Sequence, residues 1–96
     1  MPSYVVACVR WHDQSAAEAY RKITVESMGP YGGRYIARGN PAAVLEGDSP
    51  PERLAVLEFP STEKLKAWYS SPEYASGLKI RHDSATTFWL VIMEGT

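Results

Sequence analysis

The fold is decided by one stretch of the sequence, residues 44–74, which reads VLEGDSPPERLAVLEFPSTEKLKAWYSSPEY. Its centre, residues 53–59, is an apolar, β-favouring run, which predicts a strand that ends before Pro60. Ser61 is then a predicted helix N-cap, and the apolar residues after it recur at helical spacing. Ser71 followed by Pro72 is typical of a second N-cap with proline at the first helical position. We therefore expect this helix to be broken there.

Two more strands and one more helix are predicted outside this stretch. Residues 4–11 (YVVACVRW) and 86–93 (TTFWLVIM) are nearly continuous apolar runs of strand length. Between them, Ser15 and Glu18 have capping-box spacing, which predicts a helix that begins near Ser15 and stops at Gly29-Pro30.

Residues 33–46 allow two interpretations. They form either one long strand with a bulge or a hairpin that turns at Gly39-Asn40. We favour the long strand, because the Pro41 nitrogen cannot donate to a ladder and proline is tolerated at a bulge or a sheet edge. Residues 47–51 (GDSPP) predict an exposed loop before the next strand.

The order strand, helix, strand, strand, helix, strand is the ferredoxin-like βαββαβ pattern. It predicts an α+β fold in which two helices cover one face of a four-stranded antiparallel sheet. Ninety-six residues make one domain, which we place at residues 1–96.

Both faces of this sheet are predicted to be apolar, since the strands do not alternate apolar with polar residues. Glu58 is the exception in residues 53–59. No further element is available to cover the second face, and a monomer rarely exposes such a large apolar patch. We therefore expect a homodimer packed sheet to sheet, which closes a barrel-like core.

Charge and composition exclude several classes of partner. Ten basic residues against eleven acidic ones give no electrostatic footprint for nucleic acid or an anionic membrane. No apolar run approaches the roughly 20 residues of a membrane span, and the first residues lack a signal-peptide pattern. With a single cysteine, Cys8, a reducing cytoplasmic location is expected. No dinucleotide or Walker motif and no zinc spacing is present, so we expect neither a cofactor nor a metal.

Three blocks carry a resemblance to a known family: YGGRYIARG at 31–39, EGDSPPERLAVLEFPS at 46–61 and AWYSSPEY at 67–74. Over essentially its whole length the chain resembles the bacterial family called domain of unknown function thirteen-thirty. That family is placed among the dimeric α+β barrels, whose relatives include antibiotic-biosynthesis monooxygenases, muconolactone isomerases and haem-handling enzymes. The resemblance implies a dimer and lends no catalytic residues, because the family has no settled activity. Gly77 departs from the family pattern, which implies a looser second helical segment.

Glu58 is the sharpest candidate for chemistry. On an apolar face, desolvation raises a carboxyl pKa and makes the group a general acid or base. We favour the alternative, an ion pair with an arginine of a neighbouring strand. Arg34 and Arg38 are predicted to share one face of their strand, either as an anion-binding pair or as charges that protect a sheet edge. Arg10 and Arg53 are expected to be solvated.

Aromatic residues and one histidine complete the candidates. Trp68 and Tyr69 are adjacent on a helix, so one is expected in the core and the other in a cleft that suits an organic ligand. Tyr74 and His82 lie on one side of the following segment. His82 is a candidate acid or base, although a helix-capping role at the C-terminal end is the favoured interpretation.

Two functions are compatible with these residues. The first is a module that binds a small organic acid or has a structural role. The second is a cofactor-free isomerase or monooxygenase-like enzyme, in which Glu58 acts with Arg38 and with Tyr69 or His82.

Overall fold

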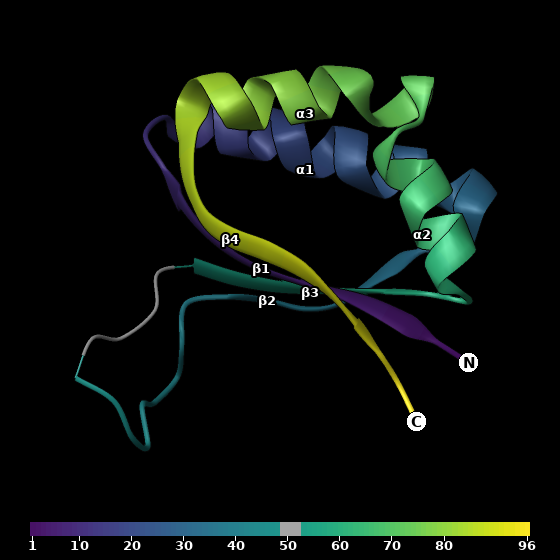
Figure 1. Ribbon diagram of the computed structural model, residues 1–96. Coiled ribbons are helices and arrows are strands. Elements are labelled where there is room, and N and C mark those ends of the chain that lie inside the picture. The colour runs from purple at the N-terminus through teal and green to yellow at the C-terminus, as the bar shows by residue number, and fades with distance from the viewer. Residues whose placement is uncertain (49–52) are drawn as a thin grey trace.

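A computed structural model describes residues 1–48 and 53–96 and confirms the ferredoxin-like α+β fold (Figure 1). The elements are β1 (Ser3–Trp11), α1 (Gln14–Met28), a 3-10 turn η1 (Gly29–Tyr31), β2 (Arg34–Gly39), β3 (Arg53–Phe59), α2 (Thr62–Tyr69), α3 (Pro72–Ser84) and β4 (Ala85–Glu94). The sheet order is β2-β3-β1-β4, and each neighbouring pair is antiparallel. Helices α1 and α3 lie side by side over one sheet face (Figure 1). None of the helices described is long and apolar enough to span a membrane.

The predicted break between α2 and α3 is present. Ser61 caps α2 by accepting a hydrogen bond from the Lys64 amide at 3.2 Å. Ser71 caps α3 by accepting from the Tyr74 amide at 3.2 Å, and its hydroxyl donates back to the Trp68 carbonyl at 2.7 Å. Pro72 follows at the start of α3, where its missing amide hydrogen is not needed. One serine thus ends one helix and begins the next.

Helix α1 begins earlier than the sequence predicted. Its N-cap is Asp13, whose carboxylate accepts from the amides of Ser15 at 2.9 Å and Ala16 at 3.4 Å. The Ser15 hydroxyl donates to the same carboxylate at 2.8 Å. Ser15 is therefore a donor inside the first turn, and the prediction that it caps the helix was wrong. Asp13 is the stronger cap because its charge favours the positive end of the helix.

Both interpretations of residues 33–46 were wrong. Strand β2 ends at Gly39, where φ is 139°, and residues 40–48 contain neither strand nor helix. It pairs antiparallel with β3, the next strand along the chain. The exposed turn predicted at 47–51 lies partly outside the described residues. A bulge is present in β2, because the register with β3 shifts between Tyr35 and Ala37.

The core lies between the helices and the sheet. It consists of buried apolar side chains from β1, α1, β3, α2 and α3: Val5, Met28, Leu57, Phe59, Leu65, Trp68 and Tyr74. Trp68 is central, because its ring lies 5.1 Å from that of Phe59 and 4.2 Å from that of Tyr74, centroid to centroid. Its indole nitrogen donates to the buried Ser27 hydroxyl at 2.9 Å. One side chain thus joins the sheet and all three helices.

Gly77 does not loosen α3, which is continuous over 13 residues. A Cβ atom at Gly77 would lie 3.0 Å from Cγ2 of Ile23 in α1. The missing side chain lets the two helices approach closely, so the expectation of a looser segment was wrong.

Gly33 offers a test of packing between the start of β2 and the core. A Cβ atom there would overlap the buried ring of Phe59, whereas at Gly29 nothing lies within 4 Å. We expect Gly33→Ala to lower the free energy of unfolding by about 1–3 kcal/mol. Gly29→Ala should change it by less than about 0.5 kcal/mol. Urea denaturation at one protein concentration measures both, and equal losses would contradict this packing.

Candidate functional site

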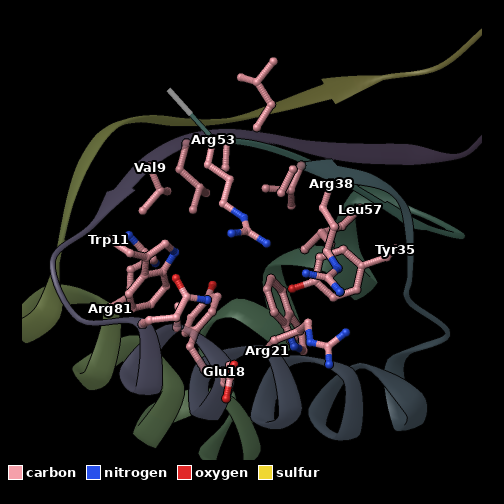
Figure 2. Close-up of a pocket in the computed structure, with 18 residues that line it drawn as sticks. Val9, Trp11, Glu18, Arg21, Tyr35, Arg38, Arg53, Leu57 and Arg81 are labelled. Atoms are coloured by element: carbon pink, nitrogen blue, oxygen red, sulfur yellow. The ribbon is translucent and has the colours of Figure 1, made fainter. Parts of the chain in front are cut away.

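A cavity of about 340 Å³ opens between α1 and the helix-covered face of the sheet (Figure 2). Its apolar wall comes from alternate residues of β1, Val5, Ala7 and Val9, together with Leu57 of β3. Aromatic side chains add to this wall: Trp11, Tyr20, Tyr35 and Trp68. The volume lies within the range of small-molecule sites. We call this cavity the basic pocket, because arginine side chains line it.

Four arginines line the basic pocket, each from a different element: Arg21 of α1, Arg38 of β2, Arg53 of β3 and Arg81 of α3. Among the lining side chains that the structure describes, Glu18 supplies the one carboxylate. Figure 2 shows the Arg53 side chain extending from β3 into the cavity, with Arg38 on the side of Tyr35. The pocket therefore carries an excess of positive charge next to an apolar surface.

The arginine side chains differ in how they are held. Arg81 is only 3% exposed, and its Nη1 donates to the Thr87 hydroxyl at 2.6 Å. The Arg38 guanidinium lies 5.7 Å from the centroid of the Tyr35 ring, in cation-π geometry. Within the described chain, no salt bridge is formed by Arg21, Arg38 or Arg53. Guanidinium groups with free donors beside an apolar wall are suited to bidentate binding of a carboxylate.

Arg34 and Arg38 do not share a face, and this part of the prediction was wrong. Arg34 is registered with Glu58 on the uncovered sheet face, whereas Arg38 is registered with Ala55 on the pocket side. The bulge at Ile36 is the physical reason, since one extra residue reverses the side to which the following residues point.

Glu58 lies on the uncovered face, away from the basic pocket. Its Oε1 accepts from Arg34 Nη2 at 2.7 Å and from Arg34 Nε at 3.0 Å. Hydrogen bonds from Arg34 and then from Tyr4 hold the pKa of Glu58 below its usual range. This geometry agrees with the ion pair that the sequence favoured over an acid-base role. Arg34 and Glu58 are therefore placed together, without Arg38.

The remaining predicted residues are divided between two places. Trp68 lines the basic pocket and is 1% exposed, while Tyr74 is fully buried behind it. Tyr69 and His82 line a second hollow, between α2, α3 and β4. The sequence predicted that one of the adjacent pair would be core without saying which, and the structure shows that it is Trp68, with Tyr69 the more exposed residue.

Sequence reasoning missed Arg21 and Arg81 and expected Arg53 to be solvated. The sequence did contain a signal that Arg53 faces the pocket. Alternate residues of a strand lie on the same sheet face, and Arg53 alternates with Ala55 and Leu57, which line the pocket. Arg81 follows Tyr74 by seven residues, which is two helical turns and places both on one side of α3. Arg21 had no such signal, because only the packing of α1 over the sheet brings it to the cavity.

Fold and site together define a ferredoxin-like α+β domain with a basic, aromatic pocket under its helices. The chain belongs to the family described as domain of unknown function (DUF1330), which it matches over residues 2–96. A comparison with functionally curated proteins finds no match.

Several solved structures have the same fold. The RPA0582 protein of unknown function from Rhodopseudomonas palustris is 18% identical, with a TM-score of 0.76 over 99% of this chain and 82% of that one. SnoaB, a cofactor-independent oxygenase from Streptomyces nogalater, is 9% identical, with a TM-score of 0.70 over 99% and 93% of the two chains. A dimeric ferredoxin-like protein of unknown function from Jannaschia sp. CCS1 is 11% identical, with a TM-score of 0.67 over 99% and 100%.

Substituting each arginine of β2 in turn should affect the pKa of Glu58 differently. Because Arg34 lowers the pKa of this carboxyl group, Arg34→Gln should raise it toward the ordinary value. Arg38→Gln, on the other face, should leave it unchanged. Any stability that the Arg34–Glu58 ion pair contributes is present above the ordinary glutamate pKa. It is lost as the pH falls through the lowered pKa of Glu58 in the folded state. Carboxyl NMR titration measures these values, and a rise in Arg38→Gln would contradict the assigned faces.

Proposed function

We propose that this protein binds a small organic acid in the basic pocket. One observation carries the proposal: Arg21, Arg38 and Arg53 reach one apolar, aromatic cavity from three separate elements. Their mutual repulsion costs stability when the pocket is empty, and a bound anion relieves it. The apolar wall supplies contact for a hydrophobic body, such as an aromatic ring.

Catalysis without a cofactor is the second candidate, and the fold shared with SnoaB, a cofactor-independent oxygenase, favours it. The proposed proton-transfer groups are Glu58 and His82. Neither lines the basic pocket, since Glu58 lies on the uncovered face and His82 in the second hollow. For this reason we place ligand binding ahead of an isomerase or monooxygenase reaction.

We also propose that the protein is a homodimer that buries its uncovered sheet face. This face has exposed apolar side chains from β2 and β4: Ile36 at 45%, Trp89 at 42%, Val91 at 48% and Met93 at 57%. A patch of this kind usually marks an interface. The fold is shared with a ferredoxin-like protein from Jannaschia that is itself dimeric, which supports a dimer here.

A thermal-shift screen of substituted benzoates and phenylacetates at millimolar concentration tests the binding proposal. Compounds that bind should raise the melting temperature, because a ligand selective for the folded state stabilises it. Arg53→Gln should weaken binding about tenfold, since a charge-assisted hydrogen bond is lost. Arg34→Gln is the matched control and should retain affinity, because Arg34 faces the other side of the sheet. Absence of binding, or an equal loss in Arg34→Gln, would contradict the proposal.

Two identical substitutions test the dimer. Val91 and Val25 are similarly exposed, at 48% and 53%, but Val91 lies on the uncovered sheet face and Val25 on α1. Val91→Glu should weaken the dimer by at least tenfold, because it buries an unpaired charge in the interface. Val25→Glu should leave the mass unchanged. Light scattering across a dilution series measures this, and a monomeric native protein at micromolar concentration would refute the pairing.

A further inference from the structure

Three tyrosines and one buried arginine gather at the wall of the basic pocket. We call them the tyrosine cluster: Tyr20, Tyr35, Tyr74 and Arg81. The hydroxyl oxygens of Tyr20 and Tyr74 are 2.5 Å apart. Tyr20 and Tyr35 both line the pocket, and Figure 2 shows Tyr35 on its β2 side. Tyr74 is fully buried and Arg81 is 3% exposed. Burying such a polar cluster in a small core lowers the free energy of unfolding unless its groups are hydrogen-bonded.

The hydrogen bonds within the cluster can be given directions. Burial raises the pKa of Tyr74, and the nearby Arg81 guanidinium opposes that rise; arginine only donates, so Arg81 cannot accept the Tyr74 hydrogen. The Tyr74 hydroxyl hydrogen is buried and needs an acceptor, and the Tyr20 oxygen at 2.5 Å is in place to receive it. The Tyr74 hydroxyl therefore donates to Tyr20.

Tyr35 lines the pocket as well, but within the described chain its hydroxyl is not bonded to Tyr74 or Arg81, so the buried pair does not orient it. Burial raises the pKa of Tyr35 to about 12, and burial also raises that of Tyr74, so both remain protonated near neutral pH. The hydroxyl hydrogen that the bond from Tyr74 leaves free is that of Tyr20, which lines the pocket.

We propose that Tyr20 donates a hydrogen bond from the floor of the basic pocket to an uncharged oxygen of the ligand, such as a ketone carbonyl. Tyr74 is a positioning residue: it occupies the Tyr20 oxygen and leaves the Tyr20 hydrogen for the cavity. The inference rests on the proposed binding of an organic acid and narrows the ligand to an oxo acid. In such a compound the carboxylate meets the arginines and a second oxygen meets Tyr20.

Polarisation strengthens this donor. A hydrogen bond that a hydroxyl accepts increases the polarity of that hydroxyl as a donor, and the bond from Tyr74 to Tyr20 lies near the charged, buried guanidinium of Arg81. Arg81 Nε has no hydrogen-bond partner within the described chain, so the guanidinium charge is only partly compensated by local bonds. An oxygen that carries partial negative charge is therefore favoured over an apolar group of the same shape.

A pair of compounds with matched shape tests this role. 4-Acetylbenzoate and 4-isopropylbenzoate both have a carboxylate and a branched substituent, but only the first has a carbonyl oxygen there. Calorimetry on the native protein should show the acetyl compound binding about 3- to 10-fold more tightly, as expected for one net hydrogen bond. Tyr20→Phe should bring that ratio close to one while leaving the affinity for the isopropyl compound within about twofold.

Two controls separate this effect from a general loss of structure. Tyr31→Phe removes a hydroxyl that donates to Glu73 at 3.1 Å, outside the basic pocket, and should keep the native ratio. Tyr74→Phe should lower the ratio in part, since Tyr20 then loses the donor that orients it, and it provides a second test if Tyr20→Phe folds poorly. Arg53→Gln should weaken both compounds alike and leave the ratio unchanged.

The outcomes are distinct. A ratio that falls in both Tyr20→Phe and Tyr74→Phe supports the inference. If both compounds bind but the ratio is near one in the native protein, or survives in Tyr20→Phe, the role of Tyr20 is refuted while the binding of organic acids stands. If neither compound binds at millimolar concentration, the oxo-acid inference and the proposed function fail together.

Discussion

The packing of Trp68 holds the helix layer to the sheet, and the other features of the molecule depend on it. Its ring stacks against Phe59 of β3 and Tyr74 of α3, and its nitrogen bonds Ser27 of α1. A buried tryptophan contributes a large apolar area and still requires a partner for its nitrogen, which Ser27 supplies. Because α2 carries Trp68, the break at Ser71 allows α3 to turn away and lie beside α1 over the sheet.

The basic pocket is a consequence of this arrangement. Where α1 passes over β1, β2 and β3, the strands present small residues such as Ala7, Ala55 and Val9, and a space remains beneath the helix. Arginines reach this space from its edges, where their charged ends can stay partly hydrated while their stems cover apolar surface. Arg81 is different, since it is buried and donates a hydrogen bond to Thr87.

The two faces of the sheet serve different purposes because strand residues alternate. On the helix-covered face, the alternation brings Arg38 and Arg53 to the pocket. On the other face, Arg34 and Glu58 form an exposed ion pair beside apolar residues of β1 and β4. The bulge at Ile36 separates the two sets within a single strand. A ligand pocket and a surface suited to a second copy can therefore coexist in one small sheet.

Local sequence determined the elements of this protein. Apolar runs of strand length, the caps at Ser61 and Ser71 and the proline after Ser71 are short-range signals, and each acts within a few residues of chain. They were sufficient for the order of strands and helices, and thus for the ferredoxin-like fold. Helical spacing also predicted that only one of Trp68 and Tyr69 lies in the core, and the structure decided that it is Trp68.

Only the tertiary structure decided the site. Side chains alternate between the two faces of a sheet, so position along a strand predicts the face of each residue unless the strand contains a bulge. Nothing in residues 34–38 by themselves indicates the bulge at Ile36 that places Arg34 and Arg38 on different faces. The convergence of Arg21, Arg38, Arg53 and Arg81 joins four elements that are distant in the chain, and the bond between Tyr20 and Tyr74 spans 54 residues. Such contacts depend on the angle and distance at which α1 and α3 pack on the sheet. Those quantities are set by the fit of many side chains together, so no local pattern could predict them.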